Sequence, residues 1–321
     1  MIRKSWIVFL FAVILSFESI LIEYLTRLLG ISPLAISAFS IAISGVLLLL
    51  ILNFVSNRQR SLVYSIKDFI PASIFLSVGI FTWYDAVSRV GASKESLLAG
   101  PIEIITVLFL ARIFLHEKLK KKQLLGICIA LVGFIMVLLS DHNSGSSSNN
   151  NGIINVTIIE VELLNFSISF GDIEAIISAI SFALAVFFLA RLSVKYSPLE
   201  ISGMCLLLSG FILIIVMLIF TPEISVNLFR SYWYIFITFS LLPLIGTICY
   251  VEGIKRIGAS LTSTIASSRI LLTLIIQIVL THIGIRNTLP DNVFLALLGG
   301  ILGITGIIII HTHIYFSKHT S

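Results

Sequence analysis

Residues 85–93 read DAVSRVGAS and residues 252–260 read EGIKRIGAS, at an offset of 167 positions. A second pair of stretches, SPLAIS at 32–37 and SPLEIS at 197–202, matches at an offset of 165. Because the matches keep their order at nearly one offset, they indicate that the chain holds two copies of one unit.

Small residues extend the same alignment. Ser44-Gly45 matches Ser209-Gly210 at an offset of 165, and two glycine pairs match at an offset of 173, namely Gly126 with Gly299 and Gly133 with Gly306. The larger offset fits a longer loop at 286–292. We therefore divide the chain into a first repeat at 1–140, a linker at 141–170 and a second repeat at 171–321.

The composition excludes a water-soluble fold. Of 321 residues, 58% are hydrophobic and 12% are charged, against about 25% charged in an ordinary soluble domain. That much apolar surface cannot be hidden in a core of this size. The net charge of +5 would suggest nucleic acid in a soluble protein. Here it indicates positive charge held on one side of a lipid bilayer, so we expect no nucleic-acid partner.

Ten segments have about the 20 apolar residues that a transmembrane helix needs. They are 6–27, 34–52, 68–88, 93–115, 122–140, 171–190, 199–220, 232–251, 261–282 and 293–313. Five spans per repeat is an odd number, so the second copy enters the membrane from the opposite side. The sequence therefore predicts an all-α integral membrane protein, built as two inverted five-helix repeats around a central cavity.

Loop charges orient the chain in the cell membrane. With the N-terminus inside, 14 of the 21 Lys and Arg residues lie on the inner side, 5 on the outer side and 2 within spans. This bias predicts that both termini are cytoplasmic. The linker at 141–170 then lies outside, and Lys94 is expected to be accessible there.

The linker differs in composition from the spans. It begins with a Ser/Asn-rich tract, typical of a flexible segment. Residues 159–170 then alternate apolar and polar side chains, which fits a short strand or hairpin, with an irregular loop as the alternative. Asn155 and Asn165 each begin a glycosylation sequon.

Motifs along both repeats resemble the EamA-type proteins of the drug/metabolite transporter superfamily. The first copy has Gly91-Ala92-Ser93, then His116-Glu117-Lys118-Leu119, then Gln123-Leu124-Leu125-Gly126, and Gly171-Asp172-Ile173-Glu174-Ala175 is similar to the start of the second copy. The sequence departs from the family at Glu103-Ile104, where Glu-Pro is common, and at Gly284-Ile285. The resemblance covers nearly all of both five-helix repeats. It implies a secondary transporter for a small metabolite such as an amino acid, a nucleotide-sugar or a phosphorylated sugar.

Three charged residues lie near span centres, where a charge costs at least about 2.5 kcal/mol. They are Glu18, Glu103 and Arg269. The repeat offset places Arg269 opposite position 102, so we expect it to interact with Glu103, directly or through substrate. A zwitterion would suit the three, with Arg269 binding its carboxylate and Glu103 or Glu18 its ammonium. The alternative is a structural salt bridge between the fourth and ninth spans.

Aromatic residues are weaker candidates. Trp83, Tyr84 and Tyr250 are expected to line the cavity, with an interfacial belt or core packing as the alternative. Ser93 and Glu95 precede or begin the fourth span, where helix capping and the helix dipole explain them.

These features favour a transporter over an enzyme. The six histidines lie at span ends or in loops, and Cys128, Cys205 and Cys249 have no ligand spacing, so we expect no metal site, no cofactor and no catalytic residue. We predict export of a small polar or zwitterionic metabolite, most simply an amino acid-like one, by alternating access. A non-transporting membrane subunit or receptor is the alternative. The expected partners are the substrate and the bilayer, and a homodimer stays open.

Overall fold

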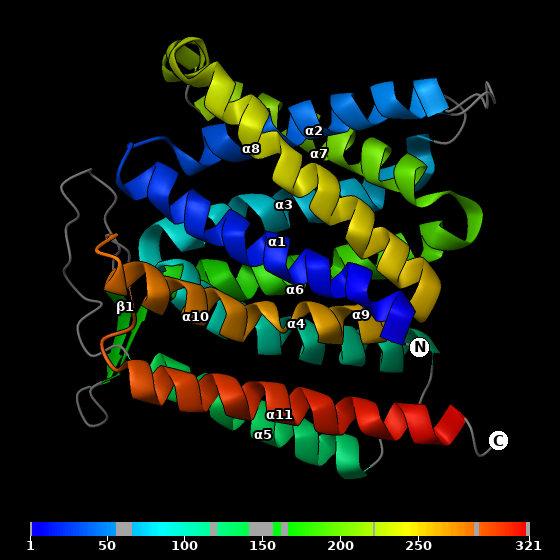
Figure 1. Ribbon diagram of the computed structural model, residues 1–321, viewed down its shortest axis with the longest axis vertical. Coiled ribbons are helices and arrows are strands. Elements are labelled where there is room, and N and C mark those ends of the chain that lie inside the picture. Colours follow the sequence, from blue (N-terminus) through cyan, green and yellow to red (C-terminus); the bar gives the residue numbers. More distant parts are fainter. Residues whose placement is uncertain are drawn as a thin grey trace.

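The chain forms a bundle of helices with a two-stranded hairpin at one end (Figure 1). The computed structural model describes residues 2–55, 66–115, 121–140, 157–161, 166–220, 222–285 and 289–318. Its elements are α1 (Ile2–Arg27), α2 (Pro33–Val55), α3 (Ile66–Val90), α4 (Ala92–Leu115), α5 (Lys121–Leu138), β1 (Thr157–Val161), β2 (Phe166–Ser169), α6 (Phe170–Lys195), α7 (Pro198–Phe220), α8 (Pro222–Ile257), α9 (Ala259–Ala266), α10 (Arg269–His282) and α11 (Val293–Lys318).

Within the described residues, seven helical segments are long and apolar enough to cross a membrane, and two shorter apolar helices lie at Leu125–Leu138 and Val293–Gly306. The outer faces of these helices expose large apolar side chains, among them Phe54, Phe211 and Ile219. Such surfaces are stable against lipid, where an α-helix satisfies its own backbone hydrogen bonds. The chain is therefore a multi-pass membrane protein. The number of ten spans and their inverted arrangement stay predictions.

One predicted span is interrupted. The segment 261–282 is two helices, α9 and α10, which meet at Ser267 and Ser268. Ser267 Oγ donates to the Thr264 carbonyl at 2.6 Å, and Ser268 Oγ donates to the Ile265 carbonyl at 2.7 Å. Serine hydroxyls that bond to nearby carbonyls compete with the helical hydrogen-bond pattern. The interruption occurs immediately before Arg269.

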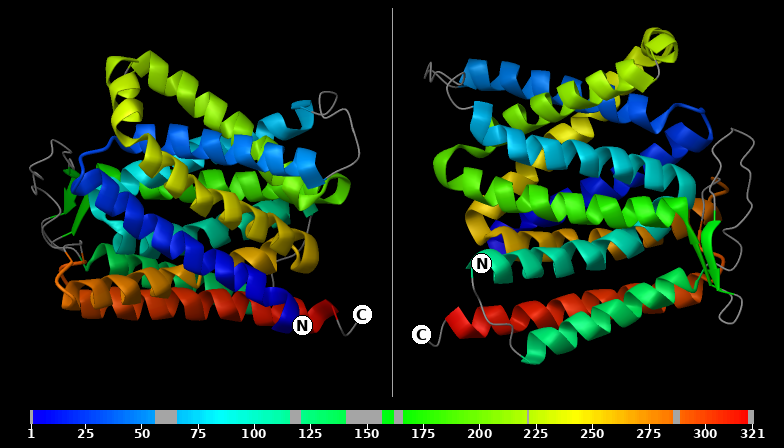
Figure 2. Two further views of the ribbon diagram at one scale, coloured as in Figure 1. Left: turned by 45° about the horizontal axis from the view of Figure 1, so that its top comes forward. Right: turned by 180° about the vertical axis from the view of Figure 1, so that it is seen from behind.

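Helices of the two halves pack against each other in pairs (Figure 1, Figure 2). The pairs are α2 with α7, α5 with α11, α3 with α6, and α1 with α8. The α5–α11 pair lies along one side of the bundle, at the lower edge of Figure 1. Each half thus packs most closely against the other half rather than against itself.

The glycines that match between the repeats lie where paired helices touch. A Cβ at Gly45 would collide with the α7 backbone at Leu207, and one at Gly210 would collide with α2 at Ala42. In the α5–α11 pair, a Cβ at Gly133 would lie 2.5 Å from the Gly299 carbonyl oxygen. Small residues allow such close approach, which gives membrane helices their van der Waals contact.

The matched serines also make equivalent contacts. Ser44 Oγ on α2 donates to the Ser240 carbonyl of α8 at 2.6 Å. Ser209 Oγ on α7 donates to the Ser73 carbonyl of α3 at 2.9 Å. Ser44 and Ser209 differ by 165 positions and Ser73 and Ser240 by 167, the offsets of the repeat. The same contact therefore holds the second and third helices of each half to helices of the other.

The two ends of the bundle differ. At one end, which we call the hairpin end, β1 and β2 pair antiparallel with Glu160 opposite Ser167. The hairpin leads directly into α6, where Ser169 and Asp172 form a capping box. Helix α1 begins and α11 ends at the opposite end, the terminus end (Figure 1).

Replacing Gly133 with alanine should destabilise the protein by about 1–3 kcal/mol, because the added methyl group meets backbone atoms of α11 that cannot move aside. The matched control is Gly246→Ala on α8, whose Cβ would have its nearest neighbours at an ordinary 3.5 Å. That change should leave stability unchanged or raise it by up to about 1 kcal/mol. Thermal unfolding of the purified variants in detergent compares the two. Equal unfolding midpoints for both variants would contradict the close α5–α11 contact.

Candidate functional site

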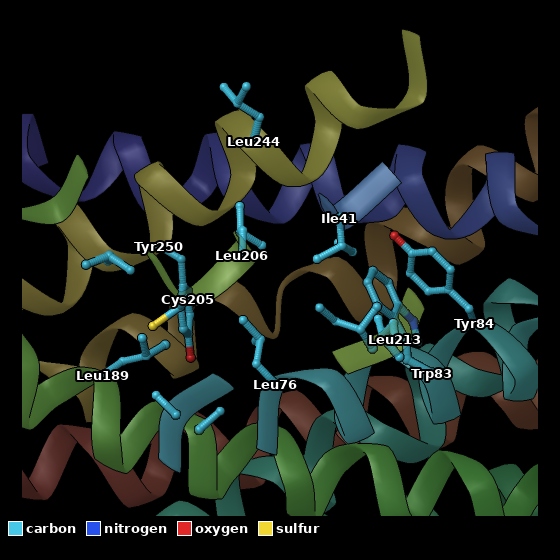
Figure 3. Close-up of a cluster of buried hydrophobic side chains, with 14 of the residues drawn as sticks. Ile41, Leu76, Trp83, Tyr84, Leu189, Cys205, Leu206, Leu213, Leu244 and Tyr250 are labelled. Carbon is cyan, nitrogen blue, oxygen red and sulfur yellow. The ribbon is translucent and has the colours of Figure 1, made fainter. Parts of the chain in front are cut away.

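A cavity lies in the bundle interior, lined by α1, α2, α3, α4, α6, α7, α8, α9 and α10. The empty space within it, including open solvent at the mouth, is about 870 Å³. Much of the wall is aliphatic: Figure 3 shows Ile41, Leu76 and Leu206 pointing into the interior from α2, α3 and α7. The described residues of α5 and α11 do not line it.

Five of the six residues predicted from sequence line this cavity, and these are Glu18, Trp83, Glu103, Tyr250 and Arg269. The sixth, Tyr84, is fully buried and lies behind the wall. The charged members come from the middle parts of α1 and α4 and from the break between α9 and α10. Helices that are distant in sequence thus bring the charges together around one space.

Arg269, the first residue of α10, is held by residues of two other helices. Its Nη2 lies 3.9 Å from Glu95 Oε1, and its guanidinium carbon lies 5.5 Å from the centre of the Trp83 ring. Trp83 Nε1 in turn donates a hydrogen bond of 3.0 Å to Glu95 Oε2. An opposite charge and an aromatic face both stabilise a buried guanidinium. The three side chains form a neutral group.

The structure therefore gives Arg269 a different ion-pair partner from the one that the repeat alignment predicts. Within the described part of the chain, Glu103 makes no ion pair or hydrogen bond, and Arg269 acts on it through longer-range electrostatic attraction. Glu95 lies two turns nearer the start of α4 and is fully buried. Sequence reasoning missed it because a carboxylate in a first helical turn has an ordinary explanation in the helix dipole.

Only one of the two carboxylate oxygens of Glu18 accepts a hydrogen bond from the described residues. The Tyr84 hydroxyl donates to its Oε1 at 2.6 Å. Its Oε2 is buried and has no hydrogen-bond partner among the described residues. The side chain of Glu18 is almost completely buried, so this oxygen is an unmet acceptor at the cavity wall.

Tyr250 forms the wall nearer the terminus end. Its hydroxyl lies 3.0 Å from Ser263 Oγ, which joins α8 to α9. Its ring packs against Phe11 of α1 with 4.6 Å between the ring centres. An aromatic residue with a satisfied hydroxyl gives this part of the cavity a rigid, apolar surface.

At the hairpin end, ion pairs connect three helices. We call Asp85, Arg89, Lys94, Asp172 and Glu174 the hairpin-end cluster. Arg89 contacts Asp85 at 3.0 Å and Glu174 at 3.1 Å, while Lys94 Nζ lies 3.0 Å from Asp172 Oδ1. The cluster holds α3 and α4 against the start of α6.

The prediction that Lys94 is accessible from outside is wrong. Its side chain is 2% exposed, because the first turn of α4 packs against the first turn of α6, which contains Asp172. From the sequence, a lysine at a predicted span boundary is expected to face solvent. Only the packing of α6 shows that Lys94 forms its ion pair inside the bundle.

A second polar group lies at the same end. Glu23 Oε2 on α1 accepts hydrogen bonds from the Ala92 backbone N–H at 2.9 Å and from Gln277 Nε2 at 2.6 Å. The Ser93 backbone N–H donates to Gln277 Oε1 at 3.0 Å. These residues satisfy the free N–H groups at the start of α4, a need that every helix N-terminus has.

The terminus end lacks an equivalent buried cluster among the described residues. Asp68 and Lys195 pair at 3.5 Å between α3 and α6, but both are exposed, and Glu252 pairs with Arg256 within α8. Val8 of α1 is instead completely buried next to Gly253. Among the described residues, this end thus has apolar packing in its interior and ion pairs only nearer the surface.

The arrangement is suited to binding. Charged groups are held at the wall of an apolar cavity, in which electrostatic attraction is stronger than in water. Within the described residues, no group of three His, Cys, Asp or Glu side chains is placed to hold a metal ion. The cavity can therefore recognise a ligand by charge and by apolar contact.

Comparisons with known proteins identify similar sequences and a similar fold. The sequence model of the EamA-like transporter family matches residues 4–139 and 169–312. The chain is 26% identical over 285 residues to the uncharacterized transporter YyaM of Bacillus subtilis (strain 168), covering 86% of this chain and 84% of that protein. A solved crystal structure with 15% identity superposes with a TM-score of 0.62, covering 97% of this chain and 96% of the other, which shows a similar fold.

A double-mutant cycle should identify Glu95 as the ion-pair partner of Arg269. Glu95→Gln alone should destabilise the protein by about 3–5 kcal/mol, because it leaves a buried charge unpaired. Adding Arg269→Gln should recover much of that loss. Combining Arg269→Gln with Glu103→Gln is the comparison, and it should give a smaller interaction energy. Unfolding of the purified variants gives the stability of each. A larger interaction energy for Arg269 with Glu103 than with Glu95 would contradict the assignment.

Proposed function

The chain belongs to the EamA-like transporter family, and we propose that it exports a small metabolite bearing an amino group, amino acid-like in size, by alternating access through the central cavity. The family makes the protein a membrane transporter rather than an enzyme. The observation that carries the proposal is the cavity itself, with Glu18, Glu103 and Arg269 at its wall. Charges within a membrane bundle are costly and are kept where they bind or move a charged species.

The packing of the two halves supports alternating access. If the repeats are inverted, α2 and α7 are equivalent, as are α5 and α11, and the α1–α8 and α3–α6 pairs exchange with each other. The helix pairs that pack together, α2–α7, α5–α11, α1–α8 and α3–α6, are compatible with this symmetry. In inverted-repeat transporters, one repeat rocks against the other around a central site.

The different chemistry of the two ends supports a cycle with two gates. In this arrangement the hairpin-end cluster closes the cavity toward the hairpin, and we place that end outside the cell, as the loop charges predict. Opening toward the outside then requires the Lys94–Asp172 and Arg89–Glu174 pairs to separate. Opening toward the cytoplasm requires that apolar side chains such as Val8 part from their neighbours and that the exposed Asp68–Lys195 pair separates.

Reconstituted protein should exchange labelled substrate, and two carboxylates should be needed for it. We expect wild-type proteoliposomes to show counterflow of a labelled amine or amino acid from a screened set. Glu18→Gln and Glu103→Gln should each lower the rate at least about tenfold, equivalent to about 1.4 kcal/mol, because each removes a charge that faces the cavity. Glu252→Gln, which alters a carboxylate outside the cavity, should keep the wild-type rate.

An absence of counterflow for every tested metabolite would favour the alternative of a non-transporting subunit or receptor. Full activity of both Glu18→Gln and Glu103→Gln, with substrate exchange intact, would show that the carboxylates serve only the fold.

Labelling of a cysteine in the cavity can test whether the hairpin-end cluster closes the cavity toward the outside. In a chain whose three native cysteines are replaced, Ile80→Cys at the cavity wall should react slowly with an impermeant thiol reagent added to intact cells. Glu174→Gln should raise that rate several-fold, because it removes one partner of Arg89 and loosens α6 from α3. Asp68→Asn, which breaks the exposed pair at the other end, should not raise that rate.

A cysteine at Ser167 in the hairpin checks the orientation of the chain in the membrane. Its protection from the reagent in intact cells would overturn the predicted topology.

A further inference from the structure

We propose that the substrate carries a net positive charge: it is an amine with an apolar or aromatic body, whose ammonium group binds between Glu18 and Glu103, and it needs no carboxylate. The inference rests on the proposed function, because it concerns the substrate of the same cavity. It narrows the expectation of a zwitterion to a cation.

The charge balance of the wall is the first step. Three ionisable acidic or basic side chains line the cavity among the described residues, namely Glu18, Glu103 and Arg269. The positive charge of Arg269 is already matched by Glu95, which does not line the cavity. Two carboxylates therefore face the space with no basic side chain left over for them. A positively charged ligand is the species that would complete this balance.

The unmet acceptor on Glu18 is the second step. Its Oε1 receives the Tyr84 hydroxyl, and its buried Oε2 receives nothing from the described residues. An ammonium group has three N–H donors and no acceptor. It can give a hydrogen bond to Glu18 Oε2, and Glu103, half-buried at the wall of the same cavity, adds electrostatic attraction. A hydrogen bond between two charges is strong in a region of low dielectric.

The remaining wall suits the rest of such a molecule. Phe11, Trp83, Phe182 and Tyr250 provide aromatic surface, and the other side chains are mainly aliphatic. Aromatic faces attract cations as well as apolar groups. A hydrophilic body with many hydroxyl groups would find few partners here, because the hydroxyl of Tyr250 is already joined to Ser263.

A carboxylate on the ligand would be a disadvantage. It would have to share Arg269 with Glu95, which is fully buried. One guanidinium would then serve two buried carboxylates, and the added negative charge would have no cation of its own. Glu18 and Glu103 would also repel it. The cavity should therefore prefer an amine to the amino acid from which it differs only by that carboxylate.

Equilibrium binding to the full chain in lipid nanodiscs tests the inference with three probes that share one phenyl group. The probes are 2-phenylethylamine, a cation, L-phenylalanine, a zwitterion, and 3-phenylpropanoate, an anion. We expect the amine to bind at least tenfold more tightly than phenylalanine, with no measurable binding of the propanoate. Phenylalanine binding as tightly as the amine, binding of the propanoate, or binding of none of the three would each overturn the proposal.

Substitutions then identify the side chains that bind the ammonium group of the amine. Glu18→Gln and Glu103→Gln should each weaken amine binding at least tenfold, and Glu252→Gln outside the cavity should leave it unchanged. Glu95→Gln frees Arg269 and should improve the binding of phenylalanine relative to the amine at least fivefold. Amine binding that is unaffected in both Glu18→Gln and Glu103→Gln would contradict the assignment. The wild-type probe series decides the question if a variant fails to fold.

Failure of this inference differs from failure of the proposed function. Binding needs no turnover, so tight and selective amine binding without counterflow would reject transport and retain the charge preference. Counterflow of phenylalanine in proteoliposomes, with equal or tighter binding than the amine, would retain transport and reject the preference.

Discussion

The buried guanidinium of Arg269 is the interaction on which the centre of this bundle depends. A charge within a membrane helix bundle is stable only if an opposite charge and hydrogen-bond partners lie beside it. Glu95 supplies the charge from α4, Trp83 supplies an aromatic face from α3, and the indole of Trp83 in turn binds Glu95. Arg269 itself lies at the start of α10, directly after the break from α9. One neutral group thus ties three helices together at the cavity wall.

Comparison of the two repeats distinguishes the residues that pack the helices together from the charged residues in and beside the cavity wall. Where the copies agree, at Gly45 and Gly210 or at Ser44 and Ser209, the residues make equivalent contacts between paired helices. The charged residues of the cavity wall and Glu95 lie where the copies differ. At an offset of 167 positions, Arg269 corresponds to Ile102, Glu95 to Thr262, and Glu103 to Ile270. A charge repeated near a pseudo-twofold axis would face its own copy and be repelled, so a binding site on such an axis benefits from residues that break the symmetry.

The same loss of symmetry distinguishes the two ends. Lys94 and Asp172 meet at the hairpin end, but position 261, which corresponds to Lys94, is a leucine. Separating the hairpin-end cluster means removing buried charges from their partners, whereas separating apolar side chains exposes hydrocarbon. These two costs respond differently to salt, lipid and ligand charge. A ligand that changes the charge of the cavity can therefore alter the free energy of opening one end more than that of opening the other.

The sequence by itself determined the class of protein, the family, and the matched glycines and serines, because hydropathy and repetition depend on residue order alone. It also identified Glu18, Trp83, Glu103, Tyr250 and Arg269 as cavity residues, since charges and aromatic residues in apolar spans are conspicuous. Only the tertiary structure decided that Arg269 pairs with Glu95, that Lys94 is buried against Asp172, and that 261–282 is two helices. A helical residue contacts whatever the neighbouring helix presents, and the rotation and depth of that neighbour are set by packing between segments far apart in the chain.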